Sequence, residues 1–217
     1  MSRAAARRQQ KAMIQLAAGY GALGVAILSL LVLMPWQTFP DPWLWAAFAA
    51  AFVYFEWNTV EVNDKLFASP SVMVILTAAV VFPADSAILG CAAIAGLAWF
   101  TPADVRERRW FQPLANFGQL VISAVVSVGL MVVVMGGQDF DQAPVWRIAV
   151  ASALAAVAYG FVNYRLVLFA VSRVYGHRDL NKWSHTAQLV VPYLGMGFLG
   201  GLLGASYLLV GPATLPL

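Results

Sequence analysis

The chain has 217 residues, of which 61% are hydrophobic and only 11% charged, and its formal net charge is +3. Soluble domains are typically about 45 to 50% apolar and about 25% charged, so a soluble globule of this composition would expose large apolar patches. The composition therefore excludes a soluble globular protein. It predicts an all-α, polytopic membrane bundle of about six or seven spans, because each span needs about 20 apolar residues.

The amino terminus is basic and precedes a long apolar run. Residues 1–12 contain four basic residues and no acidic residue, and we expect them to form a short cytoplasmic segment. The apolar run that follows, 13–34, is too long for a signal-peptide core of about 7 to 15 residues. It is the predicted first span of a single transmembrane domain that covers 13–217.

Hydropathy predicts six further segments, separated by short turns rich in proline, glycine and charge. They cover about 43–57, 68–82, 84–100, 111–135, 148–174 and 186–210. The apolar part of the second of these, Ser71 to Phe82, would reach only about 18 Å as a helix, against a hydrocarbon core of about 30 Å. Either this helix begins earlier, near Leu66, or it forms with the next segment a re-entrant hairpin broken at Phe82-Pro83.

Basic residues are distributed unevenly between the two predicted faces. With the amino terminus inside, the outer connections hold only Arg147, while the inner ones hold Arg3, Arg7, Arg8, Lys11, Lys65, Arg106, Arg108, Arg109, Arg173, Arg178 and Lys182. This asymmetry predicts a multi-pass cell-membrane protein with a cytoplasmic amino terminus. The placement at span ends, rather than in one patch, argues against a nucleic-acid partner. After Val210 the sequence is similar to the first turn of an eighth helix.

No catalytic or metal-binding pattern is found. The two histidines, His177 and His185, are eight residues apart and accompany no cluster of carboxylates or cysteines with metal-ligand spacing. The sequence therefore predicts a non-enzymatic protein without a cofactor.

Polar residues at membrane depth are the candidate functional residues, because a charge at a helix centre costs roughly 2.5 to 3.5 kcal/mol. They are Glu56, Asn116, Gln119, Asn163 and Arg165, with Tyr159 one turn away from Asn163. One interpretation is that they join helices through hydrogen bonds. The other is a polar pocket for a small ligand or a lipid headgroup that opens towards the cytoplasm. We favour the joining role for Asn163 and the pocket for Asn116 with Gln119. Glu56 and Arg165 have opposite charges at similar depth and could pair.

Two further patterns concern packing. Gly197 with Gly201, and Gly200 with Gly204, form overlapping small-xxx-small pairs that allow close helix approach, either within the bundle, which we favour, or in a homodimer. Between Thr59 and Phe67 apolar and polar residues alternate, which indicates either an extended interfacial stretch or a plain amphipathic loop, and the loop is preferred.

Three phrases together resemble a known family. They are Phe111-Gln-Pro-Leu-Ala-Asn-Phe-Gly-Gln119 followed by Ser123-Ala-Val-Val-Ser127, then Phe161-Val-Asn163, then Gly211-Pro212. From Val60 onwards the chain is similar to the amino-terminal membrane region that precedes HD-type (HD-GYP-like) phosphohydrolase domains and other bacterial signalling modules. In that family a cytoplasmic catalytic domain follows, often acting on cyclic dinucleotides, but this chain contains neither that domain nor its metal motif. The resemblance implies a sensory or anchoring role, with Asn116 and Asn163 as matching positions.

The predicted function is thus a non-enzymatic sensory or anchoring domain. It would lie in the lipid bilayer and couple a membrane or small-molecule signal to a cytoplasmic signalling domain or protein. The alternative is a small membrane protein for substrate binding or transport, similar to the substrate-capture subunits of vitamin transporters. A transporter predicts broken helices at a midplane site, and the Pro83 hairpin is the sequence feature that suggests one.

Overall fold

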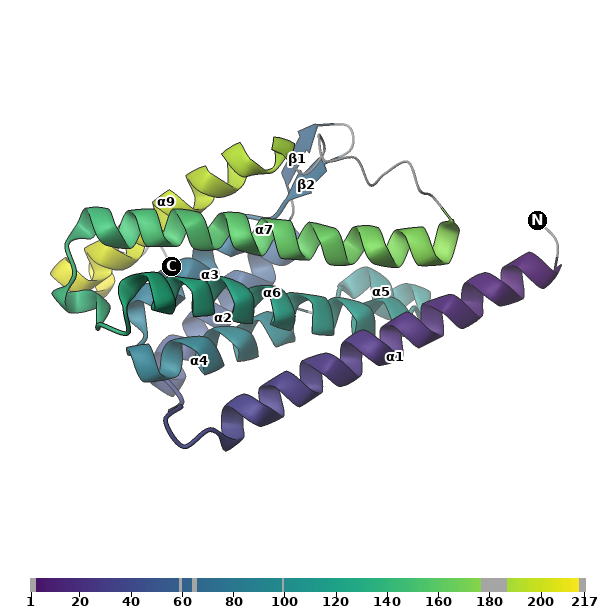
Figure 1. The fold of residues 1–217 in the computed structure, drawn as a ribbon, viewed down its shortest axis with the longest axis horizontal. Coiled ribbons are helices and arrows are strands. Elements are labelled where there is room, and N and C mark those ends of the chain that lie inside the picture. Colours follow the sequence, from purple (N-terminus) through teal and green to yellow (C-terminus); the bar gives the residue numbers. More distant parts are fainter. Residues whose placement is uncertain (1–2, 59, 64–65, 99, 177–186, 215–217) are drawn as a thin grey trace.

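The structure is a computed structural model that describes residues 3–58, 60–63, 66–98, 100–176 and 187–214. Its long helices lie roughly side by side, and one small antiparallel hairpin lies beside them (Figure 1). In the described part of the chain, four helices are long and apolar enough to cross a membrane: α1 (Arg3–Leu33), α6 (Phe111–Met135), α7 (Val145–Tyr175) and α9 (Val190–Val210). The prediction of a helical membrane bundle is confirmed.

Three predicted spans form shorter helices. They are α2 (Pro42–Trp57), α3 (Ser71–Val81) and α4 (Ala84–Leu97). Because they have 16, 11 and 14 residues, each is shorter than the roughly 20 residues that an upright span requires. The count of six or seven spans therefore stays a prediction.

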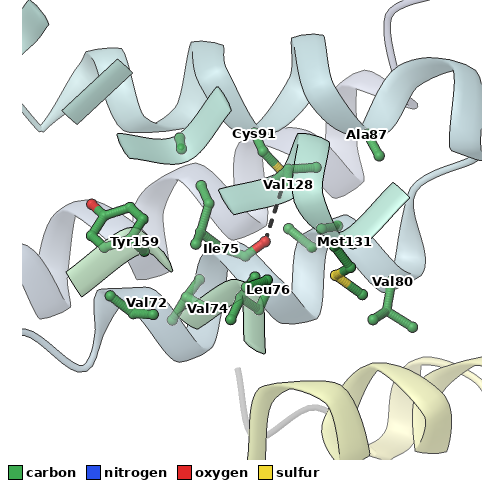
Figure 2. Packing of buried hydrophobic residues seen from close by; sticks show 14 of the residues in the cluster. Val72, Val74, Ile75, Leu76, Val80, Ala87, Cys91, Val128, Met131 and Tyr159 are labelled. Atoms are coloured by element: carbon green, nitrogen blue, oxygen red, sulfur yellow. Dashed lines mark hydrogen bonds between the residues drawn. The ribbon is translucent and has the colours of Figure 1, made fainter. Parts of the chain in front are cut away.

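Helix α3 lies at the centre of the bundle. It is apolar on all sides, and ten of its eleven residues are buried, as expected for a helix without a polar face. The surrounding helices supply the other side chains of this core, and the Cys91 Sγ atom of α4 lies 3.5 Å from the Ile75 carbonyl oxygen. Figure 2 shows Val72, Val74, Ile75, Leu76 and Val80 of α3 with Ala87 and Cys91 of α4, Val128 and Met131 of α6, and Tyr159 of α7.

The expectation that α3 begins near Leu66 is wrong. Residues Leu66–Ala68 form strand β2, which pairs with strand β1, Val60–Asn63, and the helix begins at Ser71. Pro70 explains the delay, because the residue before a proline is disfavoured in the α-helical region. The extended interpretation of this stretch is confirmed, and the preferred interpretation as a plain loop is wrong.

A break at Phe82-Pro83 separates α3 from α4. Phe82 has extended backbone angles, φ −74° and ψ 144°, as expected for a residue that precedes proline, and α4 starts directly after Pro83. The two short helices pack against each other, which fits the alternative of a broken hairpin. Whether this hairpin is re-entrant in the membrane stays a prediction.

The four α9 glycines pack inside the bundle. A Cβ atom at Gly197 would lie 2.5 Å from Ala156 of α7, and one at Gly204 would lie 2.5 Å from Val80 of α3. The same holds for Gly201, which faces α7, and Gly200, which faces α3. Internal packing is therefore confirmed. A homodimer through these glycines stays a prediction, and it would have to displace α3 or α7.

The connections gather at two ends of opposite charge. Asp85, Asp139 and Asp141 line adjoining hollows at one end, where α9 also terminates and the 3-10 turn Phe140–Gln142 lies. Figure 1 shows the amino end of α1, the short helix α5 (Pro102–Glu107) and the carboxyl end of α7 at the opposite end, where Arg8 and Arg173 line one hollow. This separation agrees with the predicted grouping of connections, while the direction in which the bundle crosses the membrane stays a prediction.

Cysteine labelling tests that direction. In a Cys91→Ala background, we expect Gln138→Cys to react with a membrane-impermeant maleimide added outside intact cells, and Glu107→Cys to react only after the membrane is opened. Native Cys91 is fully buried, so its thiol should react little with the maleimide, and the Cys91→Ala substitution removes even that residual signal. The opposite labelling pattern would show that the basic end lies outside and that the positive-inside assignment is wrong.

Candidate functional site

An amide pair joins α6 to α7. The Gln119 Nε2 atom donates a hydrogen bond to the Asn163 Oδ1 atom over 2.5 Å, and the Gln119 side chain is 8% exposed. Two of the predicted polar residues are thus brought together. The joining role expected for Asn163 fits this contact, and Gln119 also takes part in it.

Asn116 lies one turn from Gln119 on the same face of α6, as their three-residue spacing predicts. Both residues line a cleft between α1, α6 and α7, whose other walls include Met13, Val167 and Val171. The cleft has a volume of about 170 Å³. A polar edge on a mostly apolar cleft would suit a ligand that has both characters.

A second polar group joins α2 to α3. The Ser71 Oγ atom donates to the Glu56 Oε2 atom over 2.5 Å and accepts from the Ser69 Oγ atom over 2.8 Å. Ser71 is fully buried, so this chain of hydroxyls satisfies a polar side chain that would otherwise cost free energy. The expected pair between Glu56 and Arg165 stays a prediction. Arg165 lies two residues beyond Asn163, which places it on a different face of α7.

Tyr159 lies between these two groups. Its side chain is 1% exposed, and its hydroxyl makes no hydrogen bond with any described residue. Figure 2 shows the hydroxyl directed away from the aliphatic side chains of α3. Glu56 and Tyr193 are its electrostatic neighbours. A buried hydroxyl without a partner costs about 1 to 3 kcal/mol, so this position calls for an explanation.

Sequence reasoning missed Tyr193. This residue lies in the first turn of α9, is 4% exposed and interacts with Asn163. Gly160 makes room for its ring, since a Cβ atom there would lie 2.7 Å from the Tyr193 ring atoms. A tyrosine within an apolar run does not indicate which helix it faces, so the sequence could not predict the contact of Tyr193 with Asn163.

Six side chains together form the candidate site. We call them the interior polar cluster: Glu56, Ser71, Gln119, Tyr159, Asn163 and Tyr193. They come from α2, α3, α6, α7 and α9. Among the described residues no group of three or more histidines, cysteines and carboxylates could hold a metal ion, and His177 and His185 lie outside those residues. The members of the cluster offer amide and hydroxyl groups and one carboxylate.

The chain was compared with known proteins. Residues 22–211 match the MASE9 family. The chain belongs to the MASE9 family. The family is one of membrane-associated sensory domains, and the match spans the whole interior polar cluster. No curated protein and no solved structure matches the chain.

The MASE9 match settles part of the expected function. A membrane-associated sensory domain was predicted from the resemblance, and the match confirms this. The expected link to HD-type phosphohydrolases receives no support from it. The alternative as a substrate-capture protein also gains no support, because the Pro83 break lies near Asp139 and Phe140 at the acidic end and not in the interior polar cluster.

A double-mutant cycle tests the amide pair of this MASE9 chain. Gln119→Ala and Asn163→Ala should each lower the free energy of unfolding by about 0.6 kcal/mol, and by no more than about 2 kcal/mol, because interhelical hydrogen bonds in membranes are weak. The double variant should lose less than the sum, since both changes remove the same bond. Asn116→Ala is the control, because Asn116 makes no side-chain hydrogen bond with a described residue. Fully additive losses would exclude the pair.

Proposed function

We propose that this MASE9 chain is a non-enzymatic membrane sensor whose interior polar cluster binds the signal and whose basic end passes the response to a cytoplasmic signalling partner. The single observation that carries the proposal is the buried Tyr159 hydroxyl, which has no partner among the described residues. A ligand group that hydrogen-bonds this hydroxyl removes the cost of leaving it unpaired. A ligand bound at the cluster would therefore stabilise the folded protein.

Ligand binding in the cluster can affect the packing of the whole bundle. The cluster residues belong to five helices, and the Gln119–Asn163 pair connects α6 and α7 directly. A ligand shifts an equilibrium between two helix arrangements only if it binds one arrangement better than the other. A site shared among five helices meets this condition, because any change in their packing changes its geometry.

Removing the Tyr159 hydroxyl separates a sensing role from a structural one. Tyr159→Phe should leave the free energy of unfolding unchanged or raise it by up to about 3 kcal/mol, because the variant no longer buries an unpaired hydroxyl. Thermal unfolding of the purified protein in detergent measures this. If the free energy of unfolding instead fell by 1 kcal/mol or more, the Tyr159 hydroxyl would have a hydrogen-bond partner, and the observation on which the proposal rests would be wrong.

A ligand screen then tests the function itself. Compounds that raise the melting temperature of the wild-type protein should lose this effect on Tyr159→Phe, since a ligand stabilises only the state that it binds. Tyr54→Phe is the matched control, because Tyr54 is an exposed tyrosine of α2, and it should retain the full shift. If every stabilising compound acts equally on both variants, the interior polar cluster is not the sensory site.

A further inference from the structure

Two adjoining hollows lie between α1 and α7 at the basic end of the bundle. The first, which we call the basic hollow, has a volume of about 410 Å³ and is lined by Arg8, Lys11, Gln15, Leu16, Phe169 and Arg173. The second is the cleft that holds Asn116 and Gln119, which we call the apolar cleft. Leu16 lines both, so the two hollows lie on either side of one side chain.

The basic hollow brings three cations together without an anion. Arg8 and Lys11 are three residues apart on one face of α1, and Arg173 lies in the last turn of α7. None of the three forms an ion pair with a described residue, and no carboxylate lines the hollow. Like charges held close together repel, so an anion among them would lower the electrostatic free energy.

The apolar cleft indicates that the anion also carries a hydrocarbon chain. Its walls are mainly Met13, Leu16, Phe111, Val167 and Val171, which would contact a hydrocarbon chain favourably. Lys11 lies at the edge of the first predicted span, so we expect the basic hollow at headgroup depth and the apolar cleft just inside the hydrocarbon. Basic pockets between transmembrane helices are sites for anionic lipid headgroups.

We propose that the basic hollow and the apolar cleft together bind an anionic phospholipid from the leaflet around the basic end. The phosphate lies among Arg8, Lys11 and Arg173, and one acyl chain enters the apolar cleft as far as Asn116 and Gln119. The site meets the interior polar cluster at Gln119 and adds a second input, because the acyl chain would contact the residue that pairs with Asn163. The proposal does not depend on the sensory role of Tyr159.

Lipid titration of the purified chain tests the site. The purified chain in detergent is titrated with dioleoyl phosphatidylglycerol or with dioleoyl phosphatidylcholine, and bound lipid is counted by native mass spectrometry. We expect the anionic lipid to bind at least tenfold more tightly than the zwitterionic lipid. Equal binding of the two lipids would overturn the proposal.

A charge-matched pair of variants locates the site. Arg8→Gln with Arg173→Gln should weaken phosphatidylglycerol binding at least tenfold. Arg106→Gln with Arg108→Gln removes the same charge from exposed positions at the same end, and it should change the affinity less than twofold. Equal losses in both variants would indicate general surface attraction and no built site. Arg8→Lys with Arg173→Lys keeps both charges and should retain most of the phosphatidylglycerol binding. Retained binding in this variant would show that the loss in the glutamine variant comes from the missing charges and not from a folding defect.

Inorganic phosphate distinguishes a lipid from a free anion. Millimolar phosphate alone should neither raise the melting temperature nor displace the bound lipid, because it lacks the acyl chain. Ala170→Phe, which narrows the apolar cleft, should weaken binding of the lipid. Displacement of the lipid by phosphate, or full lipid affinity in Ala170→Phe, would show that the site binds a simple anion and that the lipid proposal is wrong.

Discussion

Replacing Gly118 by alanine should lower the free energy of unfolding by about 1 to 3 kcal/mol, which is typical of overpacked sites. A Cβ atom at this position would lie 1.9 Å from the Tyr20 carbonyl oxygen, where α1 crosses α6 (Figure 1). The Tyr20 oxygen belongs to the backbone and the position of the Cβ atom is fixed by the Gly118 backbone, so no side-chain rotation relieves the clash and α1 must move. Thermal or denaturant unfolding of the purified protein measures the loss.

Gly129 provides the control on the same helix. Nothing lies within 4 Å of a Cβ atom there, so Gly129→Ala should be neutral or stabilise α6 by up to about 1 kcal/mol through helix propensity. If both alanine variants behave alike, α1 and α6 do not pack as closely as described.

A second large loss is expected for Gly197→Ala, again about 1 to 3 kcal/mol. The new Cβ atom would lie 2.5 Å from both the Ala156 Cβ atom and the Ser152 carbonyl oxygen of α7, and it would force α9 away from that helix. Gly195→Ala, two residues earlier with nothing within 4 Å, should be harmless. Unfolding measured at several protein concentrations is the appropriate experiment.

The concentration dependence separates packing from dimerisation. Because Gly197 is buried within one chain, the loss should be the same at every protein concentration. If Gly197→Ala instead reduced only the dimer fraction and left monomer unfolding unchanged, the glycine pairs would serve a homodimer.

Hydropathy predicted the long helices well, because a span is a local property of the sequence. The expected segment 111–135 coincides with α6, Phe111–Met135, and the break at Pro83 follows from the chemistry of proline alone. The start of α3 was placed too early in one alternative, because the pairing of Leu66–Ala68 with Val60–Asn63 depends on a partner strand and not on hydrophobicity.

The candidate site was predicted only in part. Asn116 and Gln119 were expected to share a face because helix geometry fixes it, and Gln119 does meet Asn163. Which helices become neighbours is a tertiary property, so the contacts of Glu56 with Ser71 and of Tyr193 with Asn163 had no signal in a single sequence. The unpaired state of the Tyr159 hydroxyl likewise depends on everything that surrounds it.

The crossing of α1 over α6 has a mechanical consequence. Backbone contact at Gly118 and the hydrogen bond of 3.0 Å from the Tyr20 hydroxyl to the Leu166 carbonyl oxygen fix one point on α1. From Tyr20 to Arg3 the helix continues without interruption, a reach of about 26 Å at 1.5 Å per residue. If α1 tilted about this contact by about 5°, its basic tip would move by about 2 Å, so a small change at Tyr20 would be enlarged at the end that carries Arg8 and Lys11.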